Sequence, residues 1–240
     1  MHLILFDIDG TLVLTGGAGM RAMNRACEDL VRSDNAMAGV TFAGRTDWSI
    51  LDDILRNHGH TLDEMLLAQL RARYVMHLAE EIALPGRGVK DVMPGIRALL
   101  DALAARADAP VGLLTGDFIE GARIKLEYFD LWKYFPWGAF GGDASSRNDL
   151  VPIALSRARA HGIDVDTIRP CDVLVIGDTP NDVECALVAG ATPIAVATGS
   201  YSVDQLRAAG AGIVFGDLSD TSAFLDLLHP RRVRSNAART

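Results

Sequence analysis

Two aspartates one residue apart follow a run of apolar residues at the start of the chain, in MHLILFDIDGT. The run from Leu3 to Phe6 is typical of a buried strand, and Asp7 and Asp9 come directly after it. Carboxylates that lie close together repel each other and raise each other's pKa. The pair therefore indicates either a solvated turn before Gly10, since Asp-Gly is a common turn pair, or a site where a cation offsets the charge.

Polar residues also follow two later apolar runs. Thr115 and Gly116 end the run LLTG, and Asp178 and Asp182 lie in GDTPND. Because the carboxyl ends of parallel strands meet at one edge of a sheet, we expect these residues to lie beside the first aspartate pair. Four carboxylates in one crevice require a cation, and an all-oxygen set without His or Cys suits Mg²⁺.

The elements that must position these residues alternate along the chain. Short apolar runs that end in Gly, Asp or Thr predict strands buried on both faces. These runs are residues 2–6, 110–115, 137–140, 172–177, 192–198 and 212–215. Segments with helical spacing of apolar residues lie at 95–106, 118–128, 149–161, 181–189, 203–209 and 219–228. This alternation predicts an α/β fold, a doubly wound, Rossmann-like parallel sheet.

One region breaks the alternation. Residues 18–82 show only helical periodicity, and linkers that contain Gly and Pro flank them at 14–17 and 84–95. We therefore predict an all-helical cap domain inserted into the sheet domain. The predicted division is a core of residues 1–15 and 92–229, a cap of residues 16–91, and a flexible basic tail of residues 230–240.

Composition excludes several classes of protein. The chain has 240 residues, of which 49% are hydrophobic and 22% charged, as in ordinary globular proteins. A net charge of −8 argues against nucleic acid or an anionic membrane as the main partner. The absence of an apolar leader and the odd count of three cysteines predict a cytoplasmic protein with free thiols. The longest uncharged stretch, 185–203, is broken by Gly and Pro, so we expect no membrane span.

The motifs together resemble those of the haloacid dehalogenase (HAD) superfamily of phosphatases and phosphomutases. DIDGT is similar to the first motif of that family, LLTG to the second and GDTPND to the fourth. The third motif is usually a lysine ahead of a helix, and Arg147 in SSRNDLVPIAL fits that place. The order of the motifs and the inserted helical cap match as well, so the resemblance covers nearly the whole chain except the tail.

The resemblance implies roles for the aspartates. Asp7 would be the nucleophile that forms an aspartyl-phosphate, and Asp9 the acid that protonates the leaving oxygen and then the base that activates water. The side chains of Asp7 and Asp178 and the carbonyl of Asp9 would hold Mg²⁺. Asp182 would be an outer ligand or a support of the metal site.

It also implies residues that bind the phosphoryl group. Thr115, the amide of Gly116 and the guanidinium of Arg147 would hold the phosphoryl oxygens. Lys125 is the rival cation, but it lies in the middle of a predicted helix, where a lysine usually faces solvent. The family pattern favours Arg147, and an arginine in place of the usual lysine is better suited to bidentate contact with phosphate.

Structural explanations stand beside some of these roles. Asp182 is also placed to form a helix-capping box with Thr179, so it is either structural, a support of the metal, or both. Thr115 is an N-cap candidate too. Asp117 with Glu120 makes a better capping box, which leaves the Thr115 hydroxyl free for phosphate.

The function that the resemblance implies is a Mg²⁺-dependent phosphatase for a small phosphate monoester, of the phosphoglycolate phosphatase-like type. A phosphomutase resembling β-phosphoglucomutase is the alternative, and a non-catalytic phosphate-binding protein is an alternative of another class. In the cap, Arg45 and Thr46 are candidate substrate contacts, although a solvated loop explains them equally well. The implied partner is a small phosphorylated metabolite, and the protein is expected to be a monomer or a homodimer.

Overall fold

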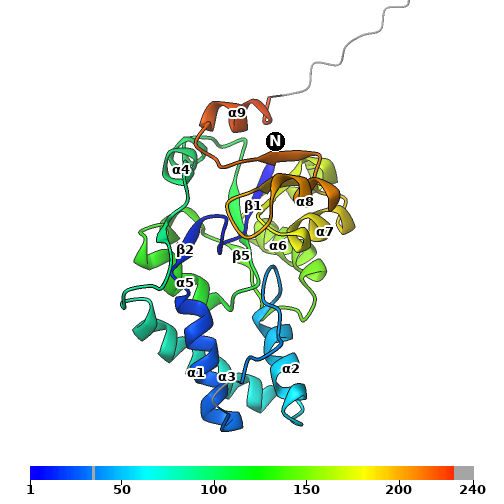
Figure 1. Ribbon diagram of the computed structural model, residues 1–240. Coiled ribbons are helices and arrows are strands. Elements are labelled where there is room, and N and C mark those ends of the chain that lie inside the picture. The colour runs from blue at the N-terminus through cyan, green and yellow to red at the C-terminus, as the bar shows by residue number, and fades with distance from the viewer. Residues whose placement is uncertain (34–35, 230–240) are drawn as a thin grey trace, which may run out of the picture.

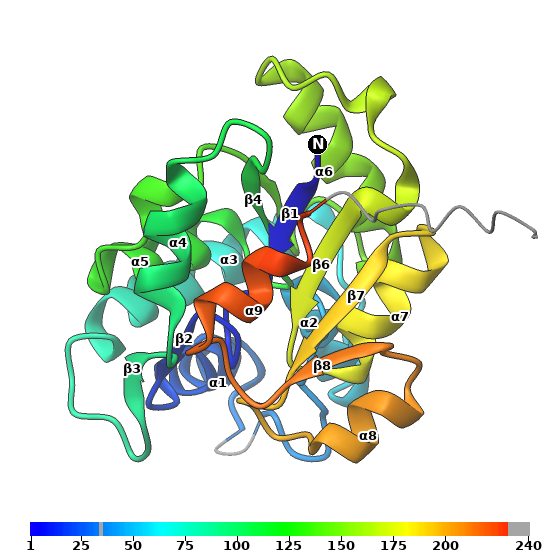
Figure 2. The same cartoon turned by 90° about the horizontal axis from the view of Figure 1, so that it is seen from above.

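The centre of the molecule is a parallel sheet of six strands in the order β5-β4-β1-β6-β7-β8 (Figure 2). The computed structural model describes residues 1–33 and 36–229. The strands are β1 (Leu3–Phe6), β4 (Val111–Leu114), β5 (Gly138–Ala139), β6 (Val173–Gly177), β7 (Thr192–Val196) and β8 (Ile213–Phe215). The chain builds outward from β1 to β5 on one side and from β6 to β8 on the other. The carboxyl ends of β1 and β6 therefore flank the point where ligands bind in such sheets.

Helices cover both faces of the sheet. Ile4 and Phe6 of β1 point to one face, in the same apolar cluster as residues of α4, α5 and α9, and Leu3 and Leu5 point to the face that α6 and α7 cover. All four side chains are fully buried, which explains why β1 is apolar throughout instead of alternating. The helices are α4 (Ile96–Ala104), α5 (Ile119–Tyr128), α6 (Leu150–Ala160), α7 (Pro180–Val188), α8 (Val203–Ala208) and α9 (Thr221–Asp226). Short 3-10 turns lie at Trp132–Tyr134, Arg147–Asp149, Val165–Thr167 and Pro170–Asp172.

Three further helices gather at the end of the molecule toward which β1 runs, opposite α9 (Figure 1). They are α1 (Ala18–Val31), α2 (Asp47–Asn57) and α3 (Glu64–Glu81). Apolar side chains of all three, such as Met23, Leu51 and Tyr74, share one buried cluster, which Phe118 of the sheet domain joins. The cap helices thus pack around their own core and close over the carboxyl edge of the sheet.

The two segments that connect the cap to the sheet pair with each other. β2 (Val13–Thr15) and β3 (Lys90–Val92) form an antiparallel two-stranded sheet, with Leu14 opposite Asp91. The prediction that both segments are plain linkers was wrong in this respect, because three-residue strands are too short to leave an apolar pattern. The chain passes between the sheet and helices α1 to α3 twice, and the two passages are paired side by side as β2 and β3.

The α/β fold class with a doubly wound parallel sheet is confirmed, and every predicted strand and helix of the core lies within a few residues of its observed position. The stretch 18–82 holds no strand among its described residues, as expected. No described helix is long and apolar enough to cross a membrane. The predicted tail, 230–240, lies outside the described residues.

Candidate active site

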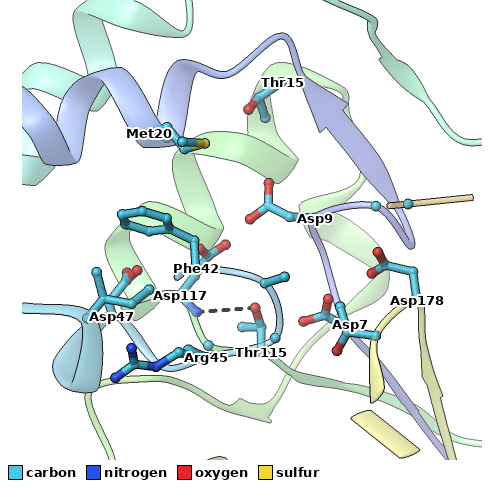
Figure 3. A pocket seen from close by; sticks show the side chains of 18 of the residues that line it. Asp7, Asp9, Thr15, Met20, Phe42, Arg45, Asp47, Thr115, Asp117 and Asp178 are labelled. Atoms are coloured by element: carbon cyan, nitrogen blue, oxygen red, sulfur yellow. Dashed lines mark hydrogen bonds between the residues drawn. The ribbon is translucent and has the colours of Figure 1, made fainter. Parts of the chain in front are cut away.

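Asp7 and Asp9 leave the end of β1 on the same side, into a pocket beneath the cap (Figure 3). Ile8 between them is fully buried in the core, so the alternation of the chain turns both carboxylates toward the pocket. The amide of Asp7 donates to the carbonyl of Ile176 in β6 at 2.9 Å, which continues the strand pairing up to the acid. Gly10 then turns the chain with φ +82°, a conformation that favours glycine.

Three buried carboxylates converge beside this loop. Asp7, Asp178 and Asp182 each offer an oxygen within 4.8 Å of the others, and their residues are 5%, 4% and 2% exposed. Burial raises the pKa of Asp178 to about 8, and the neighbouring charges of Asp182 and Asp7 add to the effect. Burial likewise raises the pKa of Asp7 to about 6, against the opposing effect of Arg147. The cluster therefore carries its full negative charge only at a cost in free energy.

Arg147 lies inside the same cluster. Its Nη2 donates to Asp7 Oδ1 at 2.8 Å and to Asp182 Oδ1 at 2.5 Å, and the residue is 7% exposed. Burial lowers the pKa of the guanidinium, but the charges of Asp182 and Asp7 more than offset this, so the pKa stays above its usual value. One guanidinium and three carboxylates leave two net negative charges when all are ionised.

This donor set fits a magnesium ion. All the ligating atoms are carboxylate oxygens, the hard ligands that Mg²⁺ prefers, and a divalent cation would balance the remaining charge. The backbone packs closely around Asp178, since a Cβ at Gly10 or Gly199 would lie 2.5 Å or 1.7 Å from its Oδ2. The Thr11 hydroxyl donates to Asp178 Oδ1 at 3.3 Å, which orients the carboxylate.

Asp182 has the structural role that its spacing indicated. Thr179 is the N-cap of α7, its hydroxyl accepts from the amide of Asp182, and the Asp182 carboxylate accepts from the amide of Thr179 at 3.0 Å. Pro180 follows at the first helical position. The capping box is confirmed. The other carboxylate oxygen of Asp182 reaches Arg147, so the same residue ties α7 to the cluster.

Thr115 and Gly116 follow β4, the neighbour of β1, and Thr115 lies beside Asp7 at the pocket (Figure 3). The amide of Thr115 donates to the Ala139 carbonyl at 3.1 Å, and its hydroxyl accepts weakly from the amide of Asp117 at 3.3 Å. The capping box predicted for Asp117 and Glu120 was wrong. The N-cap of α5 is Phe118 and has no side-chain bond, because the Asp117 carboxylate turns to a buried lysine and Glu120 pairs with a cap arginine.

That lysine is Lys125, and the expectation that it faces solvent was wrong. It is 2% exposed, and its Nζ donates to Asp9 Oδ2 and, at 2.7 Å, to Asp117 Oδ1. Burial lowers its pKa, but Asp117 and Asp9 outweigh that effect, and the pKa lies well above its usual value. The signal was present in the spacing, since Lys125 falls on the same stripe of α5 as the buried Ala122 and Leu126.

The loop before α2, residues 43–47, forms hydrogen bonds directly with the core. The amide of Asp47 donates to the Gly116 carbonyl at 2.7 Å, and the Asp47 carboxylate accepts from the amide of Phe118 at 2.8 Å. Asn181 of α7 donates to the carbonyl of Ala43 at 2.9 Å. These bonds hold the loop before α2 against the ends of β4 and α7.

The two cap residues predicted to contact substrate lie in this loop. Arg45 borders the pocket, but its guanidinium points away from the aspartates and pairs with Asp53 at 2.7 Å (Figure 3). The hydroxyl of Thr46 caps α2 and donates to the Ser145 carbonyl at 2.8 Å, and the residue is 1% exposed. Both side chains have structural partners in this arrangement, and their contact with substrate stays a prediction.

The pocket has a volume of about 370 Å³. One wall carries the predicted catalytic and phosphate-binding residues: Asp7, Asp9, Thr115, Gly116, Arg147 and Asp178. The opposite wall is mainly apolar and belongs to the cap and its connection. Its apolar members are Leu14, Met20, Met23, Phe42, Ile50 and Tyr74. The arrangement suits a small molecule whose anionic end faces the sheet.

Comparisons with known proteins find relatives over most of the chain. Residues 1–190 match the family model described as haloacid dehalogenase-like hydrolase. A phosphoglycolate phosphatase from Rhodospirillum rubrum is 30% identical over 233 residues, which cover 95% of this chain and 92% of that protein. A probable phosphatase, IndB, from Dickeya dadantii is 28% identical over 223 residues, covering 91% and 90% of the two chains.

Solved structures share the fold. CbbY from Rhodobacter sphaeroides, solved in complex with phosphate, superimposes with a TM-score of 0.69 at 21% identity, covering 94% of this chain and 99% of that one. A putative β-phosphoglucomutase from Thermotoga maritima gives a TM-score of 0.58 at 19% identity, covering 95% and 100%. Together with the family model, these likenesses identify the chain as a member of the haloacid dehalogenase-like hydrolase family.

Proposed function

We propose that the protein is a Mg²⁺-dependent phosphatase that hydrolyses a small phosphate monoester through a phosphorylated Asp7. The observation that carries the proposal is that Asp7 and Asp9 lie on one loop in different surroundings. The Asp7 carboxylate is buried beside Arg147 and two further acids, and the Asp9 carboxylate lies at the mouth of the same pocket. The names of the relatives, phosphoglycolate phosphatase and probable phosphatase, support this class of reaction.

Asp7 is the proposed nucleophile. A carboxylate oxygen of Asp7 attacks the phosphorus atom, a new P–O bond forms, and the bond from phosphorus to the ester oxygen breaks. The ion pair with Arg147 and the strand pairing behind Asp7 fix the direction of the attack. In the second step water attacks the phosphorus atom and the Asp7 carboxylate leaves.

Asp9 is the proposed proton carrier. Its side chain is 46% exposed, so it can reach both the leaving oxygen and a water molecule. Asp9 gives its proton to the departing alcohol in the first step and takes one from the attacking water in the second. Lys125 holds one oxygen of this carboxylate, which orients the other toward the pocket.

The proposed Mg²⁺ ligands are the side chains of Asp7 and Asp178 and the carbonyl of Asp9, with Asp182 as a support. When bound, the ion would neutralise the charge that an anionic phosphate brings to an anionic nucleophile. Thr115, the Gly116 amide and Arg147 are proposed to hold the other phosphoryl oxygens. Arg147 keeps a donor for this purpose, since its buried Nε has no partner among the described residues.

The division into a core of residues 1–15 and 92–229 and a cap of residues 16–91 is part of the proposal, with the cap excluding water during transfer. We place the protein in the cytoplasm as a monomer or homodimer that acts on a small phosphorylated metabolite. Its three cysteines are unpaired in the structure, as a reducing compartment would keep them.

Phosphate release tests the proposal. The wild type and Asp7→Asn are assayed with and without Mg²⁺ on sugar phosphates, nucleotides, phosphoglycolate and phenyl phosphate. We expect Mg²⁺-dependent turnover that the substitution reduces at least about 1,000-fold. Transfer of the phosphoryl group to a sugar phosphate instead of water would favour the phosphomutase. No turnover of any ester by a folded, Mg²⁺-loaded protein would favour a binding protein.

A further inference from the structure

Among residues 1–33 and 36–229, none supplies an unpaired cation to the part of the pocket away from the phosphate site. Three cationic side chains border the pocket, and each is already paired with carboxylates. Arg147 contacts Asp7 and Asp182, Lys125 contacts Asp9 and Asp117, and Arg45 contacts Asp53. Of the described residues that line the pocket, none therefore offers an unpaired positive charge to a second anionic group of the substrate.

The other ionisable groups near that part of the pocket are acids, and their partners leave them without spare positive charge: Asp117 pairs with Lys125, and Asp47 accepts from the amide of Phe118. Asp47 and Asp117 both border the cavity, and both are buried. Burial raises the pKa of Asp47 to about 6, and it raises that of Asp117 further above its usual value despite the opposing charge of Lys125. A carboxylate of the substrate placed here would lose part of its hydration without gaining a counter-charge, which is unfavourable.

Apolar side chains face the same space. Met20 of α1 is 55% exposed, although its neighbours on the buried face of the helix are covered. Met20 and the Phe42 ring lie on the cap side of Asp9, where the leaving group of a phosphate ester at Asp7 would lie (Figure 3). Carbon atoms of a ligand would cover this apolar surface and gain free energy by excluding water from it.

We propose that the preferred substrate is a phosphate monoester of an uncharged, partly apolar alcohol, and that the pocket discriminates against esters that carry a second anionic group. The inference rests on the proposed phosphatase function and deepens it. It sets this chain apart from relatives that are named for phosphoglycolate, a phosphate ester with a carboxylate on the leaving group.

A pair of esters with the same shape tests the inference. Isobutyl phosphate replaces the carboxylate of phosphoglycolate with an isopropyl group of similar size. With Mg²⁺ present, we expect kcat/KM for isobutyl phosphate to exceed that for phosphoglycolate by about tenfold or more. The opposite preference would overturn the inference while leaving the phosphatase function intact.

A substitution supplies the missing cation. Met20→Arg places a guanidinium at an exposed position of the apolar wall, and we expect it to raise kcat/KM for phosphoglycolate about tenfold relative to isobutyl phosphate. Met76→Arg is the matched control, because Met76 of α3 is 52% exposed and does not border the pocket. An unchanged ratio of the two substrates in Met20→Arg, or an equal change in Met76→Arg, would contradict the inference.

Binding separates this inference from a failure of the proposed function. If neither ester is hydrolysed, calorimetry of the wild type with Mg²⁺ compares two non-hydrolysable analogues, 3-methylbutylphosphonate and 3-phosphonopropionate. Tighter binding of the first, by about tenfold, supports the apolar leaving-group site even without turnover. Equal or tighter binding of the second overturns it.

Discussion

Two aspartates of one loop have different surroundings, and the difference fits two roles. Asp7 is 5% exposed and lies among two further acids and Arg147. The Asp9 side chain is 46% exposed and has Lys125 as its partner. A buried carboxylate with a fixed direction suits a nucleophile, whereas an accessible one suits proton transfer with the solvent.

The acid cluster predicts a pH-dependent effect of Mg²⁺ on stability. The pKa of Asp178, raised to about 8, and that of Asp7, raised to about 6, mean that the folded metal-free protein binds protons that the unfolded chain has already released. Without Mg²⁺, the stability that the bound protons of Asp7 and Asp178 contribute is therefore lost as the pH rises toward 8. Bound Mg²⁺ would offset the cost of ionising these buried carboxylates. The increase in Tm on adding Mg²⁺ is therefore expected to grow from pH 5 to pH 8, within the range of about 4 to 8 in which these groups titrate.

Differential scanning fluorimetry at saturating Mg²⁺ measures this effect. Asp178→Asn is the control, since it removes the group with the higher pKa, and the Mg²⁺-induced rise should become small at every pH. A rise in Tm that is equal at pH 5 and pH 8 in the wild type would contradict the assignment of the cluster as the metal site.

Lys125 is expected to be essential for stability as well as for orienting Asp9. Lys125→Met leaves Asp117 buried without its cation, which costs about 3 kcal/mol in the free energy of unfolding. Urea unfolding measures the loss. The double variant Lys125→Met/Asp117→Asn removes the stranded carboxylate too, and it should recover more than half of the loss. Equal stabilities of the single and double variants would show that the ion pair with Asp117 does not matter.

At the scale of elements, the loop before α2 approaches the core closely at Gly44. Gly44 has φ +68°, and a Cβ there would lie 2.3 Å from the Thr179 hydroxyl at the start of α7. Gly44→Ala should therefore push the cap loop off the core and lower kcat/KM by about 10- to 100-fold, since small displacements of a catalytic arrangement have effects of this size.

Gly59→Ala is the matched control for that variant. Gly59 also has a positive φ, +77°, but a Cβ there would meet nothing within 4 Å. Both variants should lose about 1 kcal/mol of stability from backbone strain, and only Gly44→Ala should lose activity. Equal activity of the two variants would contradict the link between cap closure and turnover.

The elements show which features could be predicted from the sequence. β1 and β6 are continuous apolar runs that end in an aspartate, so both their burial and the meeting of Asp7 with Asp178 followed from the rule for parallel strands. The Thr179 capping box could also be predicted, because it depends only on the residue types and spacing of one short segment.

Features that depend on contacts with distant residues could not be predicted from the sequence. β2 and β3 pair only because the cap returns the chain to the core, and nothing in three residues reveals that pairing. Lys125 is buried because Asp9, from the distant end of β1, is one of its partners, and the Asp117 carboxylate turns to that lysine instead of capping α5. Local propensity yields to tertiary contacts at these places, all of which lie at or near the pocket.

On the scale of the whole molecule, the reaction needs two parts that contribute different things. The sheet places charged groups at its carboxyl edge, where strands from distant parts of the chain end together. The cap adds an apolar wall and covers the site, and it is tied to the sheet by a short pair of strands. Under the proposed function, the charged side of the pocket would hold the phosphoryl group, and the choice of leaving group would belong to the apolar side.

The central claim is that the phosphoryl group passes through Asp7, and trapping it there tests the claim most directly. Asp9→Asn is mixed with phenyl phosphate and Mg²⁺, quenched in acid and digested, and the mass of the peptide that carries Asp7 is measured. Phenol has a pKa of about 10 and leaves without a strong proton donor, so the first step should proceed while the loss of Asp9 slows the second. We predict one phosphoryl group on Asp7, absent from Asp7→Asn and from samples without Mg²⁺. A phosphoryl group on another residue, or turnover by Asp7→Asn at the wild-type rate, would contradict the account.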